Sequence, residues 1–157
     1  MFAIKRILAP IDFSAPSLKA LKAAAEFSRP YEAELVVMFA VERGFYESPL
    51  LVPDEGAILL HQKKAAEVKL GEICGRLRED GINGRPLVDV GVAHKAIVDA
   101  AKRMRASLII ISTHGRTGLA HVLIGSVAER VVQHSTCPVL TIRTVPPLKP
   151  RRGGRSR

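Results

Sequence analysis

Tryptophan is missing from this 157-residue chain, and the chain contains only two cysteines, five phenylalanines and two tyrosines. With so few aromatic side chains, the core must be aliphatic. Cys74 and Cys137 lie in apolar patterns and form no paired motif, so we expect no disulfide framework and a cytoplasmic protein. No apolar run approaches the ~20 residues that a membrane-spanning helix needs, and we expect no membrane association.

Several motifs of nucleotide and hydrolase chemistry are also absent. The turn between Pro10 and Pro16 contains no glycine, whereas a dinucleotide-binding turn needs several. The P-loop pattern GxxxxGK[ST] and the nucleophile motif GxSxG do not occur. The histidines have no metal-ligand spacing, so a zinc site is not expected. These absences argue against a Rossmann dehydrogenase, a P-loop ATPase and a serine hydrolase.

The net charge of +9 is concentrated at the C-terminal end of the chain. Six basic residues and no acidic residue lie in residues 143–157, which leaves a formal charge of +3 on residues 1–142. Residues 1–144 are therefore expected to form one domain without a nucleic-acid-binding face. Residues 145–157 are rich in Pro, Gly and Arg, and we expect a basic disordered tail. Weak, salt-sensitive contact of this tail with nucleic acid is the less favoured alternative.

Short apolar runs alternate with helical periods along the chain, which predicts an α/β fold with a parallel sheet in three α/β/α layers. Pro86 makes the third strand an edge strand, and right-handed crossovers then favour the order 3-2-1-4-5. The predicted strands are 4–11, 34–41, 85–90, 108–111 and 138–144, and the predicted helices run from 14 to about 29, 57 to about 80, 94 to about 105 and 126 to about 134.

The predicted order places a topological switch point between the first and fourth strands. There Asp12 would lie beside the loop from Ser112 to Gly118, where ligands bind in open α/β sheets. Asp12 could brace the first helix, or it could accept hydrogen bonds from a base or a ribose. The glycines that follow could serve turn geometry, or they could bind an anion.

Ser126, at the start of the last helix, has two interpretations. With Glu129 it fits a capping box, in which its hydroxyl would bind the backbone of the first turn. Alternatively, its hydroxyl and the N–H groups of Val127 and Ala128 could hold phosphate oxygens. Glu129 would repel a phosphate unless its side chain points away.

With these features in view, residues 4–144 resemble the universal stress protein family. The resemblance implies an adenine nucleotide alpha hydrolase-like fold, ATP as ligand (with Mg or Mn) and a homodimer formed through the last strand, 138–144. The matching motifs are Pro10-x-Asp12-x-Ser14, Gly91, the block Thr113–Leu119, the block Leu123–Val131 and Cys137-Pro138-Val139-Leu140.

Members that bind ATP carry the pattern G-x2-G-x9-G-[S/T], and this chain departs from it at one position. Gly115, Gly125 and Ser126 match, but Ser112 stands where the first glycine is expected. Its Cβ and hydroxyl should weaken or adjust binding rather than abolish it. Asp12 would lie near adenine and ribose. The resemblance implies a site made of Pro10, Asp12, Ala40, Val41, Ile111, Ser112, Gly115, Gly118, Gly125, Ser126 and Val127.

Two functions remain open on these grounds. The first is an ATP-binding regulator of a stress response, a dimer whose nucleotide state alters the binding of protein partners. The second is a member that has lost nucleotide binding and serves as a dimeric scaffold, which Ser112 supports. Slow ATP hydrolysis is a third class, but the sequence offers no Walker lysine and no evident base, so no catalytic residue is predicted.

Overall fold

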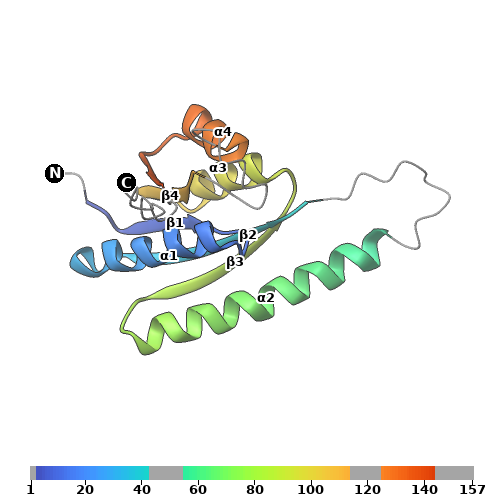
Figure 1. Ribbon diagram of the computed structural model, residues 1–157, viewed down its shortest axis with the longest axis horizontal. Helices are drawn as coiled ribbons and strands as arrows, with labels where there is room; N and C mark the ends of the chain where they lie inside the picture. The colour runs from blue at the N-terminus through green and yellow to red at the C-terminus, as the bar shows by residue number, and fades with distance from the viewer. Residues whose placement is uncertain (1–2, 43–54, 114–124, 144–157) are drawn as a thin grey trace, which may run out of the picture.

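The computed structural model describes residues 3–42, 55–113 and 125–143, and these form a parallel sheet covered by helices on both faces (Figure 1). The strands are β1 (Arg6–Pro10), β2 (Glu34–Val41), β3 (Gly84–Val90), β4 (Leu108–Ser112) and β5 (Val139–Ile142). The helices are α1 (Ala15–Ser28), α2 (Glu55–Glu79), α3 (Ala93–Arg103) and α4 (Ser126–His134), and the 3-10 turn η1 (Arg29–Tyr31) follows α1.

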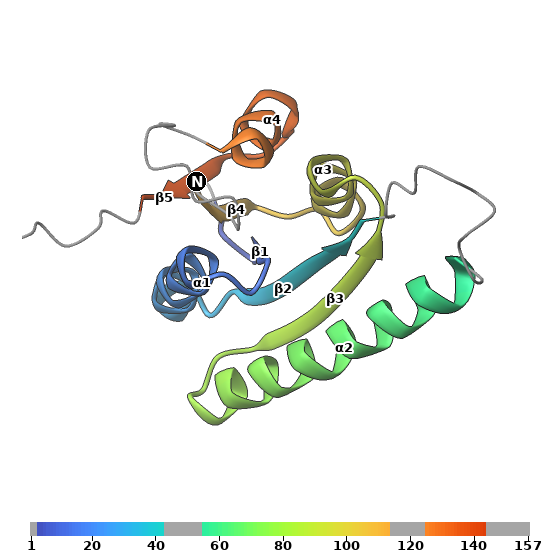
Figure 2. The ribbon, with the colours of Figure 1, turned by 45° about the vertical axis from the view of Figure 1, so that its right-hand side comes forward.

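The strand order is β3-β2-β1-β4-β5 and all pairings are parallel, which confirms the predicted topology. One face of the sheet is covered by α1 and α2, and the opposite face is covered by α3 and α4 (Figure 2). Alternate strand residues therefore enter different cores: Ile7 packs with α1 and α2, whereas Leu8 packs with α3 and α4. Every residue of β4 is buried, as expected for a strand covered on both sides.

The first helix ends at Ser28, close to the predicted end at about 29, and Pro30 lies in the 3-10 turn η1 that follows, because its fixed φ suits that turn and its missing N–H falls at its start. The structure corrects the ends of two predicted strands. The strand expected over 138–144 is shorter and ends at Ile142 within the described residues. The fourth strand extends one residue further than predicted, so that Ser112 belongs to β4.

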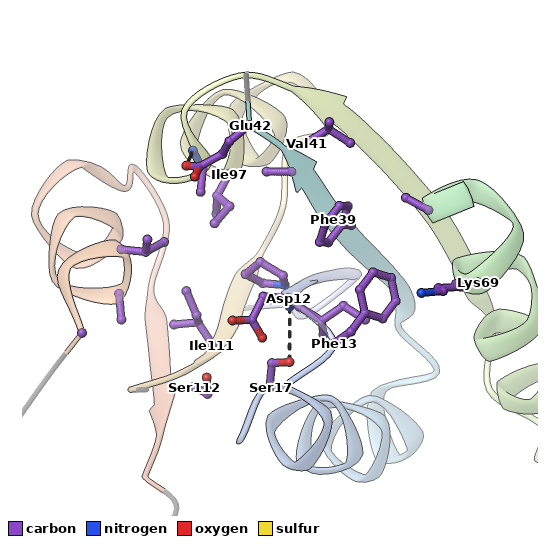
Figure 3. Close-up of a pocket in the computed structure, with 18 of the residues that line it drawn as sticks. Asp12, Phe13, Ser17, Phe39, Val41, Glu42, Lys69, Ile97, Ile111 and Ser112 are labelled. Carbon is purple, nitrogen blue, oxygen red and sulfur yellow. Dashed lines mark hydrogen bonds between the residues drawn. The ribbon is translucent and has the colours of Figure 1, made fainter. Parts of the chain in front are cut away.

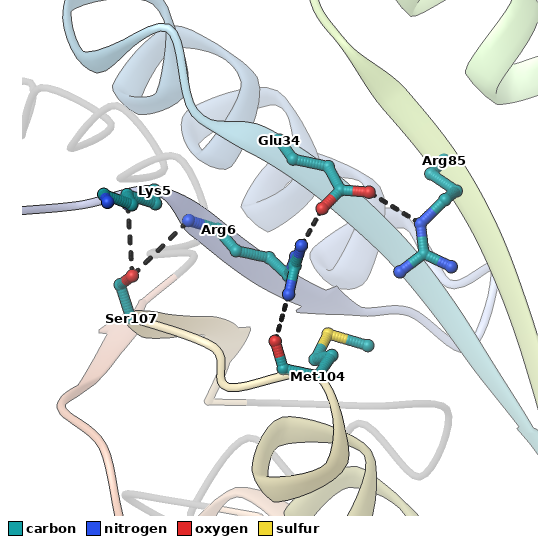
Figure 4. Close-up of polar contacts among 6 residues, drawn as sticks. All are labelled: Lys5, Arg6, Glu34, Arg85, Met104 and Ser107. Atoms are coloured by element: carbon teal, nitrogen blue, oxygen red, sulfur yellow. Dashed lines mark hydrogen bonds and ion pairs between the residues drawn. The ribbon is translucent and has the colours of Figure 1, made fainter.

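A polar network ties the amino-terminal ends of three strands together (Figure 4). Arg6 and Arg85 both bind the carboxylate of Glu34, the latter at 2.7 Å, and Arg6 also donates to the Met104 carbonyl at the end of α3. Burial alone raises the pKa of Glu34, but the hydrogen bonds from the two guanidinium groups outweigh it and hold the pKa below its usual range. The network therefore fixes β1 between its neighbours.

Ser107 joins β1 to the start of β4 at the same end of the sheet. Its hydroxyl accepts from the backbone N–H groups of Lys5 at 3.1 Å and Arg6 at 3.4 Å, and its own N–H donates to the Arg6 carbonyl at 2.8 Å. These bonds lie at the opposite end of the sheet from the strand ends that carry the predicted site.

None of the helices in the described residues is both long enough and apolar enough to cross a bilayer.

Candidate functional site

A cavity of about 790 Å³ lies at the carboxyl ends of β1, β2 and β4, at the switch point of the sheet (Figure 3). Ligands of open α/β folds bind at such points because the connections that follow two neighbouring strands run to opposite faces of the sheet and leave a crevice. The structure brings nine of the eleven predicted residues to its wall, and Gly115 and Gly118 lie outside the described residues. The nine are Pro10, Asp12, Ala40, Val41, Ile111, Ser112, Gly125, Ser126 and Val127.

Asp12 is held in a tight turn between β1 and α1. Its Oδ1 accepts hydrogen bonds from the N–H of Ser14 at 3.0 Å and from the Ser14 hydroxyl. Ser14 is the N-cap of α1, as predicted, and its oxygen accepts from the N–H of Ser17 at 3.3 Å. The carboxylate thus braces the helix and also faces the cavity. The two interpretations of Asp12 do not exclude each other.

Ser112 is buried at the last position of β4, with 7% of its surface exposed, and it pairs with Ile142 of β5. Its position within a regular strand means that the backbone does not require glycine here. Any effect of the serine on a ligand must therefore come from the volume and polarity of its side chain at the cavity wall. Thr113 continues the chain and donates its N–H to the Ile142 carbonyl at 3.0 Å.

The amino-terminal end of α4 opens on the cavity, and of the two interpretations of Ser126 the capping box is wrong. Gly125, not Ser126, is the N-cap, and no side chain among the described residues caps this end. Glu129 accepts from Gln133 Nε2 at 3.4 Å and does not line the cavity. The first N–H groups of a helix have no partner inside it and carry partial positive charge, so this end suits an anion.

Sequence reasoning missed an aromatic and basic part of the wall. Phe13 and Phe39 lie with ring centroids 4.9 Å apart, and Lys69 Nζ lies 5.4 Å from the centroid of the Phe13 ring. Phe13 has a φ of +63°, which phenylalanine rarely adopts, so nothing in its residue type signals the turn. The sequence offers one signal for Lys69, the charged face of the helix predicted over 57 to about 80.

Glu42 and α3 form a further part of the rim. Glu42 Oε1 accepts from the N–H of Ala93 at 2.9 Å, so a carboxylate stabilises the start of α3. His94 follows directly, and burial lowers its pKa, with the positive charges of Arg130, Lys95 and His134 adding to the effect. Among the described residues of the cavity wall, Asp12 and Glu42 carry carboxylates. No cluster of three or more metal-binding side chains occurs among the described residues.

Comparisons with known proteins converge on one family. The model of the universal stress protein family matches residues 3–143. The universal stress protein MJ0531 of Methanocaldococcus jannaschii is 34% identical over 143 residues, covering 88% of this chain and 82% of the relative. The solved structure of MJ0577, from the same organism, superposes with a TM-score of 0.81 at 28% identity, covering 92% of this chain and 99% of that one. A universal stress protein solved in complex with cAMP superposes with a TM-score of 0.70 at 23% identity, covering 91% and 99% of the two chains.

Proposed function

The chain belongs to the universal stress protein family, and on that basis we propose that it binds ATP in the cavity at the switch point and acts as a dimeric, nucleotide-responsive regulator. As expected from the sequence, residues 1–144 form the binding domain in this proposal and residues 145–157 form a basic tail. The cytoplasm is the compartment in which we expect it to act.

The observation that carries the proposal is the uncapped end of α4 opposite Asp12 across one cavity. An adenine nucleotide has an anionic end and a hydrogen-bonding end, and the wall offers a matching group at each side. A solved relative with this fold is in complex with cAMP, which is an adenine nucleotide. The volume of about 790 Å³ lies within the range of small-molecule sites.

Each residue takes the role that the family resemblance implies. Asp12 would accept hydrogen bonds from ribose or adenine, and Ala40 and Val41 would line the base. Ile111 and Ser112 would lie near the ribose. Gly125, Ser126 and Val127 would donate to phosphate oxygens, with any Mg or Mn arriving bound to the phosphates.

Isothermal titration of the purified chain with Mg-ATP tests this function. We expect saturable binding at one site per chain, weakened at least tenfold by Asp12→Ala, since a carboxylate that accepts from a ligand contributes about 1.5–3 kcal/mol. Asp99→Ala is the matched control, because Asp99 is exposed on α3 and does not line the cavity. Absence of heat and of binding by equilibrium dialysis would overturn the proposal.

The alternative function is a dimeric scaffold without nucleotide, and Ser112 is the observation that favours it. Its side chain occupies a wall position where ATP-binding relatives carry glycine. Protein that purifies without nucleotide and gains ATP affinity only as Ser112→Gly would support the scaffold. Dimerisation through β5 belongs to both functions, because β5 forms an edge of the sheet.

A further inference from the structure

The part of the cavity that faces α2 differs from the part that carries the expected nucleotide-binding residues. Two phenylalanine rings line it, together with side chains from one face of α2, and none of these residues belongs to the set expected to hold ATP. Figure 3 shows Phe13 and Phe39 between Asp12 and Lys69. This aromatic compartment consists of Phe13, Phe39, His61, Gln62, Ala65, Ala66 and Lys69.

The backbone beneath the aromatic surface is held by contacts within the protein. Phe13 keeps its left-handed backbone conformation, with φ at +63°, although this costs about 1 kcal/mol for a residue other than glycine. The turn is fixed on both sides by the hydrogen bonds between Asp12 and Ser14, and the ring is in contact with Phe39. Strained backbone of this kind concentrates at binding sites, where it positions a side chain.

A positive charge stands at the border of this surface. Lys69 Nζ lies 5.4 Å from the Phe13 centroid, within range of a cation–π interaction, and Lys69 forms no ion pair with a carboxylate among the described residues. Lys69 is exposed, so this contact is worth about 0.5–1 kcal/mol and leaves the charge of the ammonium group unneutralised. His61 lies on the same wall, two helical turns before Lys69. The carboxylates of Asp12 and Glu42 also line the cavity, and that of Asp12 accepts from Ser14.

We propose that the aromatic compartment binds a planar aromatic organic anion, with its ring against Phe13 and Phe39 and its anionic group at Lys69. The two rings supply apolar contact, and the ammonium group of Lys69 supplies charge complementarity. This inference goes beyond nucleotide binding and does not depend on it, because no residue of the compartment belongs to the set expected to hold ATP.

The test is a fluorescence titration of the full chain with 8-anilinonaphthalene-1-sulfonate, an aromatic sulfonate. We expect saturation at one dye per chain, and Lys69→Glu should weaken the affinity about fivefold by removing an attraction and adding a repulsion. Lys64→Glu makes the same charge change on an exposed residue of α2 outside the cavity, and it should leave the affinity within about twofold of the parent. Phe39→Leu, which keeps an apolar side chain but removes the ring, should also weaken binding.

Equal dye affinity in the parent, Lys69→Glu and Phe39→Leu would overturn the inference, because the dye would then bind elsewhere. Circular dichroism confirms that each variant is folded, and Lys69→Met replaces Lys69→Glu if the latter is not. Titration with Mg-ATP on the same samples separates the two proposals. Dye binding that depends on Lys69 in a protein without ATP affinity supports this inference alone, whereas ATP binding with a Lys69-independent dye signal overturns this inference alone.

Discussion

Ser112 shows how one side chain can matter without any change of backbone. It lies in a regular strand, is paired with Ile142, and contributes only its side chain to the cavity wall. A glycine at this position would enlarge the cavity at the wall without altering the path of β4. The departure from the family pattern is therefore a question of space next to a ligand.

We predict that Ser112→Gly binds ATP about fivefold more tightly than the parent, because about 1 kcal/mol of steric and desolvation cost is removed. The same change should lower the free energy of unfolding by about 0.5–1 kcal/mol, since glycine loses more backbone entropy in a strand. Isothermal titration and urea denaturation measure the two effects. Ser112→Ala, which keeps the Cβ, separates the methylene from the hydroxyl. Unchanged ATP affinity in Ser112→Gly would show that the serine does not obstruct the site.

For single residues, the sequence predicts local hydrogen bonds better than contacts between side chains. Asp12 and Ser14 were recognisable because their hydrogen bonds are local and follow from helix-capping rules. The contact of Phe13 with Phe39 was not, because it joins the turn after β1 to β2 through a backbone conformation that phenylalanine seldom takes. Lys69 was missed because its position over the ring depends on how α2 packs.

The elements are joined at the opposite end of the sheet by Glu34, whose carboxylate binds guanidinium groups from β1 and β3. Its side chain is 20% exposed, so solvent screens these bonds only in part. Removing the charge of Glu34 leaves two arginines facing a neutral group and weakens the contacts that hold the three strands together.

We predict that Glu34→Gln lowers the free energy of unfolding by about 1–2 kcal/mol at pH 7. The pKa of Glu34 is lowered in the folded state from its ordinary value of 4.5, so its stabilisation is fully present above pH 4.5 and is lost as the pH falls through the folded pKa. Denaturation of the parent and the variant should therefore show a stability difference that is constant near neutrality and shrinks below pH 4.5. Glu67→Gln is the control, because its pair with Lys63 is exposed and 3.9 Å long. A difference that does not change with pH would contradict this origin.

Element order and sheet order followed from the sequence because they depend on global rules, namely hydrophobic periodicity and right-handed crossovers. Element ends did not, because they depend on local competition. Ser112 continues β4 where the sequence predicts the start of a loop, and Gly125 caps α4 although Ser126 has the better capping side chain. The shape of the cavity could not be predicted either, because it depends on how α2 packs against the sheet.

For the whole molecule, the two edges of the sheet differ. The edge strand β3 pairs with β2 over seven residues and packs against α2, whereas β5 has four residues. The Pro138 carbonyl accepts from Ile109 of β4 and the Ile142 carbonyl accepts from Thr113, just after β4, each at 3.0 Å. Alternation therefore turns the backbone of Val139 and Thr141 toward the open side. Those groups can pair with a second copy.

We predict that Thr141→Pro weakens self-association at least tenfold while the monomer stays folded, because proline removes an outward N–H and leaves the bonds to β4 in place. Sedimentation equilibrium measures the dissociation constant. Thr141→Val keeps the N–H and should associate as the parent does. Equal association of Thr141→Pro would exclude backbone pairing at β5.

The hydrogen bond between Thr113 and Gly125 has a consequence for the geometry of the cavity wall. Gly125 donates to the Thr113 carbonyl at 2.6 Å, and the N–H of Thr113 is itself bound to Ile142 of β5. The end of β4 and the start of α4 are therefore clamped to each other and to β5 within the described residues. The spacing between Ser112 and Ser126 at the cavity wall is thus set by the sheet itself.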